Sequence, residues 1–375
     1  MQFAEGPVAE GAFAWWRSLP LADSAWKGSR PRLRPMLMPK LVNPSFGDPG
    51  LYVDFRNEKR ALLFDIGDIG ALAPRKLLRL SHVFVSHTHM DHFMGFDWLL
   101  RVSLGRDLAV RLFGPPGFVD QVAHKLAAYT WNLIESYPGD FRVLASEIHP
   151  EGRLASALFR CRRRFDRETL DDAYINDGVL VDEPGFRVRT AFLEHRTPCL
   201  AFAVEEKAHV NIWKNRLEEM GLPVGPWIRD LKDAVLNSAP DDMPTRAWWH
   251  EGGERKERVL ALGELKARAL QLVPGEKVCY VTDAAFSEQN AQRIIGLAKE
   301  ADLLFIESVF LHEDADQAQK KSHLTARQAG EIARAAGARV VVPFHFSPRY
   351  AGREAALRAE LERAFRGDSG GQADG

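Results

Sequence analysis

Short apolar runs separated by turn-forming residues predict several β-strands in the first half of the chain. Residues 51–67 (LYVDFRNEKRALLFDIG) hold two such runs around a polar turn, which predicts a hairpin. Residues 81–86 form a short β-branched and aromatic run, and residues 108–117 read as a strand that a Pro/Gly turn ends. Residues 186–206 predict two further strands with His195 between them.

The second half of the chain alternates between strand and helix patterns. Residues 277–286 and 301–310 predict strands, and the segment between them has helical spacing. A helix is expected over 326–336, then a strand over 339–346 and a final helix from Pro348 to Arg366. Paired strands early and alternation late predict an α/β layer architecture.

The chain divides into one large segment with two distinct ends. Residues 1–34 carry several aromatic side chains and are expected to form an N-terminal arm. Residues 35–366 are expected to form the main domain, and the polar tail 367–375 is expected to be disordered. Within the main domain, Asn237–Lys256 is rich in Pro, Gly and charge, which favours a loop.

Composition limits the function classes. The 375 residues carry 50 Lys and Arg against 51 Asp and Glu, so any contact with nucleic acid must rest on local patches. The four arginines between Arg160 and Arg164 form one such patch, which is either a solvated face or an RNA contact. Three cysteines lie far apart, which excludes a disulfide scaffold and a thiolate zinc knuckle and favours the cytoplasm. The aromatic N-terminus has no apolar run long enough for a signal peptide or a membrane span.

The strongest chemical signal is Ser86-His87-Thr88-His89-Met90-Asp91-His92, directly after a predicted strand. Four potential ligands within six residues can divide between two neighbouring ions. Imidazole and carboxylate ligands without a thiolate suit zinc, and manganese or iron remain possible.

This motif resembles the signature of the metallo-β-lactamase superfamily. The resemblance implies an αββα sandwich, with two facing mixed sheets flanked by helices and two metal ions at the sheet edge. Three further ligands would each follow a strand, and the chain offers His195, Asp283 and His345. One ion would then be held by His87, His89 and His195, the other by Asp91, His92 and His345, and Asp283 would bridge them.

Within that superfamily, the segment 311–350 resembles ribonuclease Z, including its closing HFSPRY and a loop around His323. Glu307 takes the place of a glutamate that supports this histidine. The segment 220–232 resembles the Gly-Pro motif of the arm that grips tRNA, which implies an arm over about 207–240 with Gly225 and Pro226 as contacts. The resemblance implies removal of the 3′ trailer from precursor tRNA by a homodimer.

Two alternatives to this activity stay open. The same frame could hydrolyse another phosphodiester or ester, because several family motifs differ here and Lys207–Leu236 carries five bases against four acids. A non-catalytic RNA-binding protein is the other alternative, against which the complete ligand set argues.

Roles for individual residues follow as hypotheses. Asp91 would be the general base for the attacking water, and His323, supported by Glu307, would protonate the leaving 3′-oxygen. Ser347 and Arg349 would bind substrate phosphate at the start of the final helix. Supporting roles fall to Asp65 and Asp68, which would orient ligand histidines, and to Thr325, which would cap the 326–336 helix.

Overall fold

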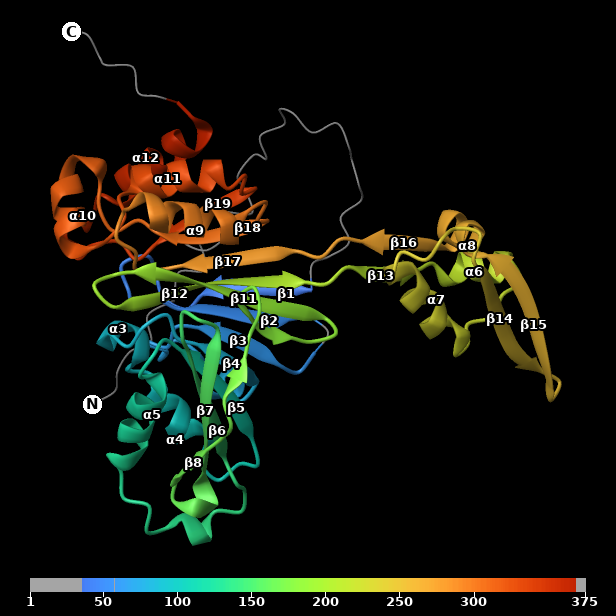
Figure 1. Ribbon diagram of the computed structural model, residues 1–375, viewed down its shortest axis with the longest axis horizontal. Helices are drawn as coiled ribbons and strands as arrows, with labels where there is room; N and C mark the ends of the chain where they lie inside the picture. Colours follow the sequence, from blue (N-terminus) through green and yellow to red (C-terminus); the bar gives the residue numbers. More distant parts are fainter. Residues whose placement is uncertain (1–35, 57, 369–375) are drawn as a thin grey trace, which may run out of the picture. The chain divides into compact units, whose positions relative to one another are not determined.

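The apolar runs fold into two β-sheets in the computed structural model, which describes residues 36–56 and 58–368 (Figure 1). The expected N-terminal arm lies outside the described residues, as do residues 369–375 of the expected tail. None of the described helices is long and apolar enough to cross a membrane.

The first sheet has the strand order β1-β2-β3-β4-β5-β6-β7-β8, and β9 pairs with β7. Strands β3 to β6 run parallel to one another, so their carboxyl ends share one edge of the sheet. The bounds are β1 (Leu37–Leu41), β2 (Leu51–Phe55), β3 (Ala61–Phe64), β4 (Leu80–Phe84), β5 (Ala109–Gly114), β6 (Arg142–Ile148), β7 (Arg153–Arg160), β8 (Arg167–Thr169) and β9 (Ala173–Tyr174).

The second sheet has the order β10-β11-β12-β17-β18-β19, and its last three strands are parallel. The bounds are β10 (Val179–Asp182), β11 (Phe186–Glu194), β12 (Pro198–Glu206), β17 (Lys277–Val281), β18 (Leu303–Glu307) and β19 (Val340–Phe344). Its outer helices are α9 (Glu288–Ala298), α10 (Ala315–Lys321), α11 (Ala326–Ala335) and α12 (Glu354–Arg366).

Three apolar clusters hold these layers together. The cluster between the sheets contains aromatic rings from both, including Phe64 and Phe84 of the first and Phe202, Tyr280 and Phe344 of the second. The other two clusters fill the outer faces of the sheets beneath the helices. Both sheets are thus buried on two sides, which is why their central strands are nearly all apolar. The resulting helix-sheet-sheet-helix order confirms the predicted fold class.

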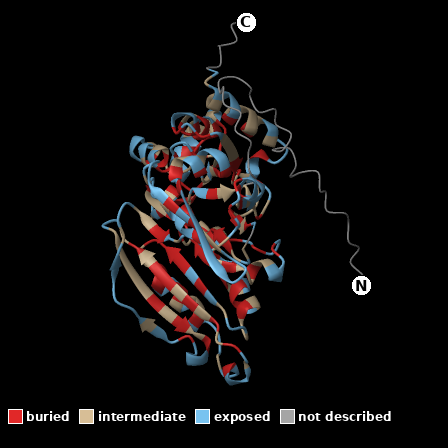
Figure 2. Ribbon diagram, turned by 90° about the vertical axis from the view of Figure 1, so that its right-hand side faces the viewer, coloured by how far each residue is buried: buried red, intermediate tan, exposed pale blue. Residues whose placement is uncertain are grey.

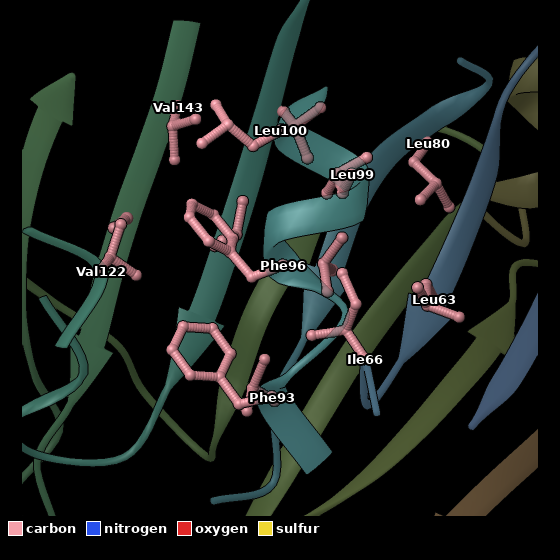
Figure 3. Packing of buried hydrophobic residues seen from close by; sticks show 14 of the residues in the cluster. Leu63, Ile66, Leu80, Phe93, Phe96, Leu99, Leu100, Val122 and Val143 are labelled. Carbon is pink, nitrogen blue, oxygen red and sulfur yellow. The ribbon is translucent and has the colours of Figure 1, made fainter. Parts of the chain in front are cut away.

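Helices α3 (Met90–Phe93), α4 (Phe96–Ser103) and α5 (Phe118–Ala127) belong to the outer face of the first sheet. In α4, Phe96, Leu99 and Leu100 are buried at helical spacing and face the strands (Figure 3). Figure 2 shows buried positions, in red, on many strand segments, and exposed positions, in pale blue, on outer helices and loops.

Residues 209–273, called the arm segment below, have a separate apolar cluster that includes Leu217, Trp227 and Leu265. The chain enters through β13 and leaves through β16, which pair with each other. The elements are β13 (His209–Ile212), α6 (Lys214–Glu219), α7 (Trp227–Leu236), β14 (Pro244–Glu251), β15 (Glu254–Ala261), α8 (Leu262–Ala269) and β16 (Leu270–Val273).

Two sequence predictions are wrong. Much of Asn237–Lys256 is not a loop, because β14 and β15 pair as a hairpin whose two-residue turn is Gly252-Gly253. Both glycines have positive φ (63° and 86°), as a tight hairpin turn requires. The final helix begins at Glu354 and not at Pro348, since residues 348–350 form a short 3₁₀ turn.

Candidate active site

Asp65 organises the loop that carries the histidine motif. It follows β3 with a φ of 56°, and its fully buried carboxylate accepts hydrogen bonds from the Ser86 backbone (2.7 Å) and hydroxyl (2.9 Å). The same carboxylate lies 2.9 Å from His92 Nδ1. The predicted contact between Asp65 and a motif histidine is therefore present, and it leaves His92 Nε2 to face the site.

The loop can approach β3 because residue 67 is glycine. A Cβ at Gly67 would lie 1.8 Å from the Asp91 carbonyl oxygen. Any side chain there would push the Asp91 backbone away, so the glycine sets the position of the metal-ligand motif.

The first group of potential ligands contains His87, His89, His195 and Asp283, whose donor atoms lie within 4.8 Å of one another. Asp283 Oδ2 is 3.7 Å from His87 Nε2 and 3.3 Å from His195 Nε2. His195 sits in the β11–β12 turn, where its Nδ1 lies 2.7 Å from the Ser322 carbonyl oxygen. That contact turns Nε2 of His195 toward Asp283.

A second group contains Asp91, His92 and His345, and a third joins Asp283 and His345 to Glu307 and His323. Asp91 Oδ2 is 3.4 Å from His92 Nε2 and 3.7 Å from His345 Nε2. Asp283 reaches the second group too, since its carboxylate lies 3.5 Å from His92 and 2.9 Å from His345. Asp283 therefore stands between the first two groups, as a bridging ligand would.

Burial and charge act on these groups in opposite directions. Burial lowers the pKa of His87 to about 2, so that its imidazole is neutral, the form that binds a metal. Burial alone would also lower the pKa of His345, but the Asp283 carboxylate raises it to about 10. The Asp283 carboxyl has a pKa well below its usual range, because His345 and His92 outweigh the effect of burial. Asp283 is thus a buried charge that needs positive partners.

His323 and Glu307 form a hydrogen-bonded pair beside the potential metal ligands. Glu307 ends β18 and is fully buried, and its Oε2 lies 2.8 Å from His323 Nδ1. Its other oxygen accepts hydrogen bonds from the Ala284 (2.8 Å) and Leu324 (3.1 Å) amides. Burial lowers the pKa of His323, but the Glu307 charge and hydrogen bond outweigh it and the pKa is raised.

The loop that carries His323 is rigidly held. Thr325 caps α11 through a reciprocal hydrogen-bonded pair with Gln328, which confirms the predicted cap. Ser322 before it has a φ of 61° and supplies the carbonyl that orients His195. The rings of His195 and His323 lie 4.8 Å apart, so the β11–β12 turn and the α10–α11 loop bring these two histidines side by side.

Other predicted site residues lie in different surroundings. Gly225 and Pro226 precede α7 in the arm segment, and Pro226 is exposed. Ser347 makes no capping hydrogen bond, and Arg349 pairs with Asp314 at 3.5 Å and covers the ring of Phe310. No described α-helix starts at Ser347, so the predicted helix start is wrong, and phosphate binding by Ser347 and Arg349 stays a prediction.

The contacts of Asp68 differ from those predicted. Its carboxylate caps the amide of Gly70, and its backbone contacts Asp48 and Asn43. A histidine is not among these partners.

Tyr280 and Ser86 contact Asp65 but were not identified from the sequence. The hydroxyl of Tyr280 donates to Asp65 Oδ2 at 2.9 Å, and both residues are buried. Ser86 is the first residue of the histidine motif, so the sequence does point to it. Tyr280 lies on an apolar strand of the other sheet, and no local pattern links it to Asp65.

Comparison with known proteins shows which families this chain resembles. The family model described as "Beta-lactamase superfamily domain" matches residues 266–346, a range that includes Asp283, Glu307, His323 and His345. Ribonuclease Z of Deinococcus radiodurans is 29% identical over 334 residues, which is 88% of this chain and 95% of that protein. The chain is thus similar to a β-lactamase superfamily domain over residues 266–346 and to ribonuclease Z over most of its length.

The chain is also similar to other proteins of this kind. Ribonuclease Z of Brevibacillus brevis is 27% identical over 80% of each chain. Among solved structures, the short form of human tRNase Z is 18% identical, covering 83% of this chain and 90% of its own, with a TM-score of 0.45. The His and Asp groups described above could hold metal ions, and each of them includes at least one residue within the range that matches the superfamily domain.

Proposed function

We propose that this protein is a two-metal phosphodiesterase of the ribonuclease Z type, which removes the 3′ trailer from precursor tRNA. One observation carries the proposal: the Asp283 carboxylate lies close to histidines of both ligand groups, and the Glu307–His323 pair lies directly beside it. The similarity to ribonuclease Z extends over most of the chain, which favours RNA as the substrate.

The ligand geometry supports two metal ions. Around a tetrahedral zinc with bonds of about 2.0–2.1 Å, neighbouring ligand atoms lie about 3.3 Å apart. Asp283 lies 3.3 to 3.7 Å from His87, His92 and His195, and Asp91 lies 3.4 Å from His92. His345 is closer to Asp283, at 2.9 Å. His92 Nε2 is buried and makes no hydrogen bond among the described residues, as expected of an atom that binds a metal.

We propose zinc as the metal, with manganese or iron as alternatives, because the donors are imidazole nitrogen and carboxylate oxygen. Bound there, the ions would polarise the scissile phosphoryl group and make water a nucleophile at neutral pH. The nearest thiol, Cys199, faces His87 Nδ1 at 3.7 Å, whereas His87 Nε2 faces Asp283. All three cysteines are free, which supports a reducing compartment, and we propose the cytoplasm.

Two side chains of the protein would accept and donate the protons of the reaction. Asp91 is partly exposed and stays ionised, because hydrogen bonds from His345 and His92 outweigh burial and lower its pKa. Its carboxylate can orient the attacking water and accept its proton. His323 lies beside His195 and His345, with ring centroids 4.8 and 5.7 Å away. Glu307 outweighs burial and raises the pKa of His323, which favours the protonated form that can donate to the leaving 3′-oxygen.

The charge of the arm segment favours a second candidate function, hydrolysis of a smaller phosphodiester. Residues 209–273 carry ten bases against ten acids, a weak electrostatic basis for holding a polyanion. We propose that Gly225 and Pro226 contact tRNA through the shape of this segment and not through its net charge. A precursor tRNA assay separates the two functions.

An exposed apolar cavity of about 670 Å³ supports the proposal of a homodimer. Met94, Trp98, Tyr129 and Trp131 line it, and Met94 and Trp98 are 48% and 45% exposed. Exposed apolar surface of this kind marks contact sites, and its position beside the motif loop would place a second copy near the active site.

Turnover of bis(p-nitrophenyl) phosphate by zinc-loaded protein tests the catalytic part of the proposal. We expect turnover that a chelator abolishes and added zinc restores. Asp283→Asn should lose it while remaining folded. Absence of turnover in folded, metal-loaded wild-type protein would favour the non-catalytic RNA-binding alternative.

A further inference from the structure

The β11–β12 turn meets the carboxyl end of α10 at the edge of the active site. Two contacts join them: His195 Nδ1 lies 2.7 Å from the Ser322 carbonyl, and the Arg196 guanidinium donates to the Lys320 carbonyl. Arg196 has a φ of 56°, so the turn adopts an uncommon backbone conformation where it meets the helix.

This junction concentrates positive charge. Arg196, Lys320 and Lys321 are all exposed, and none of them forms an ion pair with any residue in the described part of the chain. Glu194 is the one acid in the segments 194–197 and 318–323, against these three bases. Many other exposed bases do have acidic partners, such as Arg353 with Glu313 and Arg366 with Glu362.

Helix stability accounts for only part of this arrangement. Lysines in the last turn of a helix interact favourably with its dipole, which explains Lys320 and Lys321. It does not explain Arg196, which lies on another element. Unpaired cations from two elements beside a phosphodiesterase site match the charge of a nucleic-acid backbone.

We propose that Arg196, Lys320 and Lys321 form a phosphate-binding lip for the RNA strand on the leaving-group side of the cut. This inference rests on the proposed function. If His323 protonates the leaving 3′-oxygen, the nucleotide that carries this oxygen lies beside His323. The phosphates that precede it then pass the lip, because residues 320 and 321 directly precede the His323 loop and Arg196 adjoins the ligand His195.

The test compares the double variant Lys320→Gln/Lys321→Gln with the control Lys59→Gln/Lys299→Gln. Lys59 and Lys299 are also exposed, but each precedes the strand (β3 or β18) whose far end carries a site residue. Both pairs lose two charges, so the net charge of the protein is matched. Arg196 is kept, because its side chain holds the turn.

Three readouts are measured for both variants and the wild type. They are kcat/KM for precursor tRNA, turnover of bis(p-nitrophenyl) phosphate, and the salt dependence of binding to a labelled single-stranded oligoribonucleotide of about 12 nucleotides. The small diester is too short to reach the lip, and the binding assay does not need cleavage.

For the lip variant we expect RNA affinity and kcat/KM to fall about 5- to 25-fold near 0.1 M salt, with a log-log salt slope smaller by about 1.4. Turnover of the small diester and the control variant should match the wild type. An unchanged slope and affinity in the lip variant would overturn the proposal. If wild-type protein turned over the small diester but left precursor tRNA intact, the proposed substrate would be wrong, and the binding slope would still decide about the lip.

Discussion

The hydroxyl of Tyr280 donates a 2.9 Å hydrogen bond to the carboxylate of Asp65, and this bond joins the two sheets at the active site. Tyr280 lies on β17 of the second sheet, and Asp65 follows β3 of the first. The same carboxylate holds Ser86 and lies against His92. Burial and the Asp65 charge raise the pKa of Tyr280 well above its ordinary value, so the phenol stays protonated and can donate.

Tyr280→Phe should therefore weaken metal binding although Tyr280 contacts no metal. We expect zinc affinity to fall about 10- to 100-fold, as for other residues that orient a ligand. The free energy of unfolding should fall by about 1–3 kcal/mol, because a buried carboxylate loses a donor. Zinc competition against a chromophoric chelator and urea unfolding measure the two effects.

Tyr52→Phe is the matched control, since Tyr52 also donates its hydroxyl, to the Lys76 carbonyl at 3.2 Å, but does so away from the ligands. It should lower stability slightly and leave zinc affinity unchanged. Equal zinc affinities for Tyr280→Phe and wild type would contradict the positioning role.

His323→Ala should lower kcat for RNA cleavage by about 10²–10⁴, the usual contribution of a positioned acid. Zinc content should stay near that of wild type, because the proposed ligand set does not include His323. A variant with an unchanged kcat would remove His323 from the chemistry.

The pH profile tests how Glu307 acts on His323. An acid works only while protonated, so activity should fall as pH rises through the pKa of His323, which Glu307 raises above its ordinary value. Glu307→Gln removes the charge, and the alkaline limb should then move to lower pH. A limb that does not move would show that another group controls it.

His82 makes folding stability sensitive to acid. Burial lowers its pKa from 6.5 to about 4 in the folded protein, although Glu183 acts in the opposite direction. Between pH 6.5 and 4 the unfolded chain binds the proton more readily, so stability is lost as pH falls through this window, by up to about 3 kcal/mol. Above pH 6.5 His82 is neutral in both the folded and the unfolded chain, so it does not change the pH dependence of stability there.

His82→Phe should remove this acid sensitivity, since the ring already stacks on Phe84 and Phe113. The free energy of unfolding from urea titrations, compared at pH 7 and pH 4.5, should fall less for the variant than for the wild type. Protonation of the metal ligands lowers stability equally in both proteins, so it cancels when the two losses of unfolding free energy are subtracted. Parallel losses would contradict the assignment.

Trp98→Lys should convert a homodimer to a monomer, because it places a charge in the exposed apolar cavity. Light scattering after size-exclusion chromatography measures the mass. Leu272→Lys is the control, since Leu272 is 53% exposed on β16 in the arm segment. A dimer that survives Trp98→Lys would place the interface elsewhere.

The sequence predicted the elements whose signals are local. The strands around His195, the β-strand before the histidine motif and the Thr325 cap each depend on a few neighbouring residues, and each is present. The fold class followed because strand and helix patterns alternate along the chain.

Features that depend on tertiary contacts could not be predicted. The Tyr280–Asp65 bond joins residues 215 positions apart on different sheets. Ser347-Pro348 has the local signature of a helix start, but the chain there forms a 3₁₀ turn, with Tyr350 N bonded to the Ser347 carbonyl, and α12 begins only after Arg353. The hairpin of the arm segment has a charged, glycine-containing sequence that is also typical of a loop, so the local pattern predicts a loop there.

The most direct test of the proposed function is cleavage of a precursor tRNA with a 3′ trailer by zinc-loaded protein, with His89→Ala as the control. We expect a metal-dependent cut just after the discriminator base in the wild type and none in the variant. An intact precursor, together with rapid turnover of bis(p-nitrophenyl) phosphate, would contradict the proposed substrate and direct the search to smaller phosphodiesters.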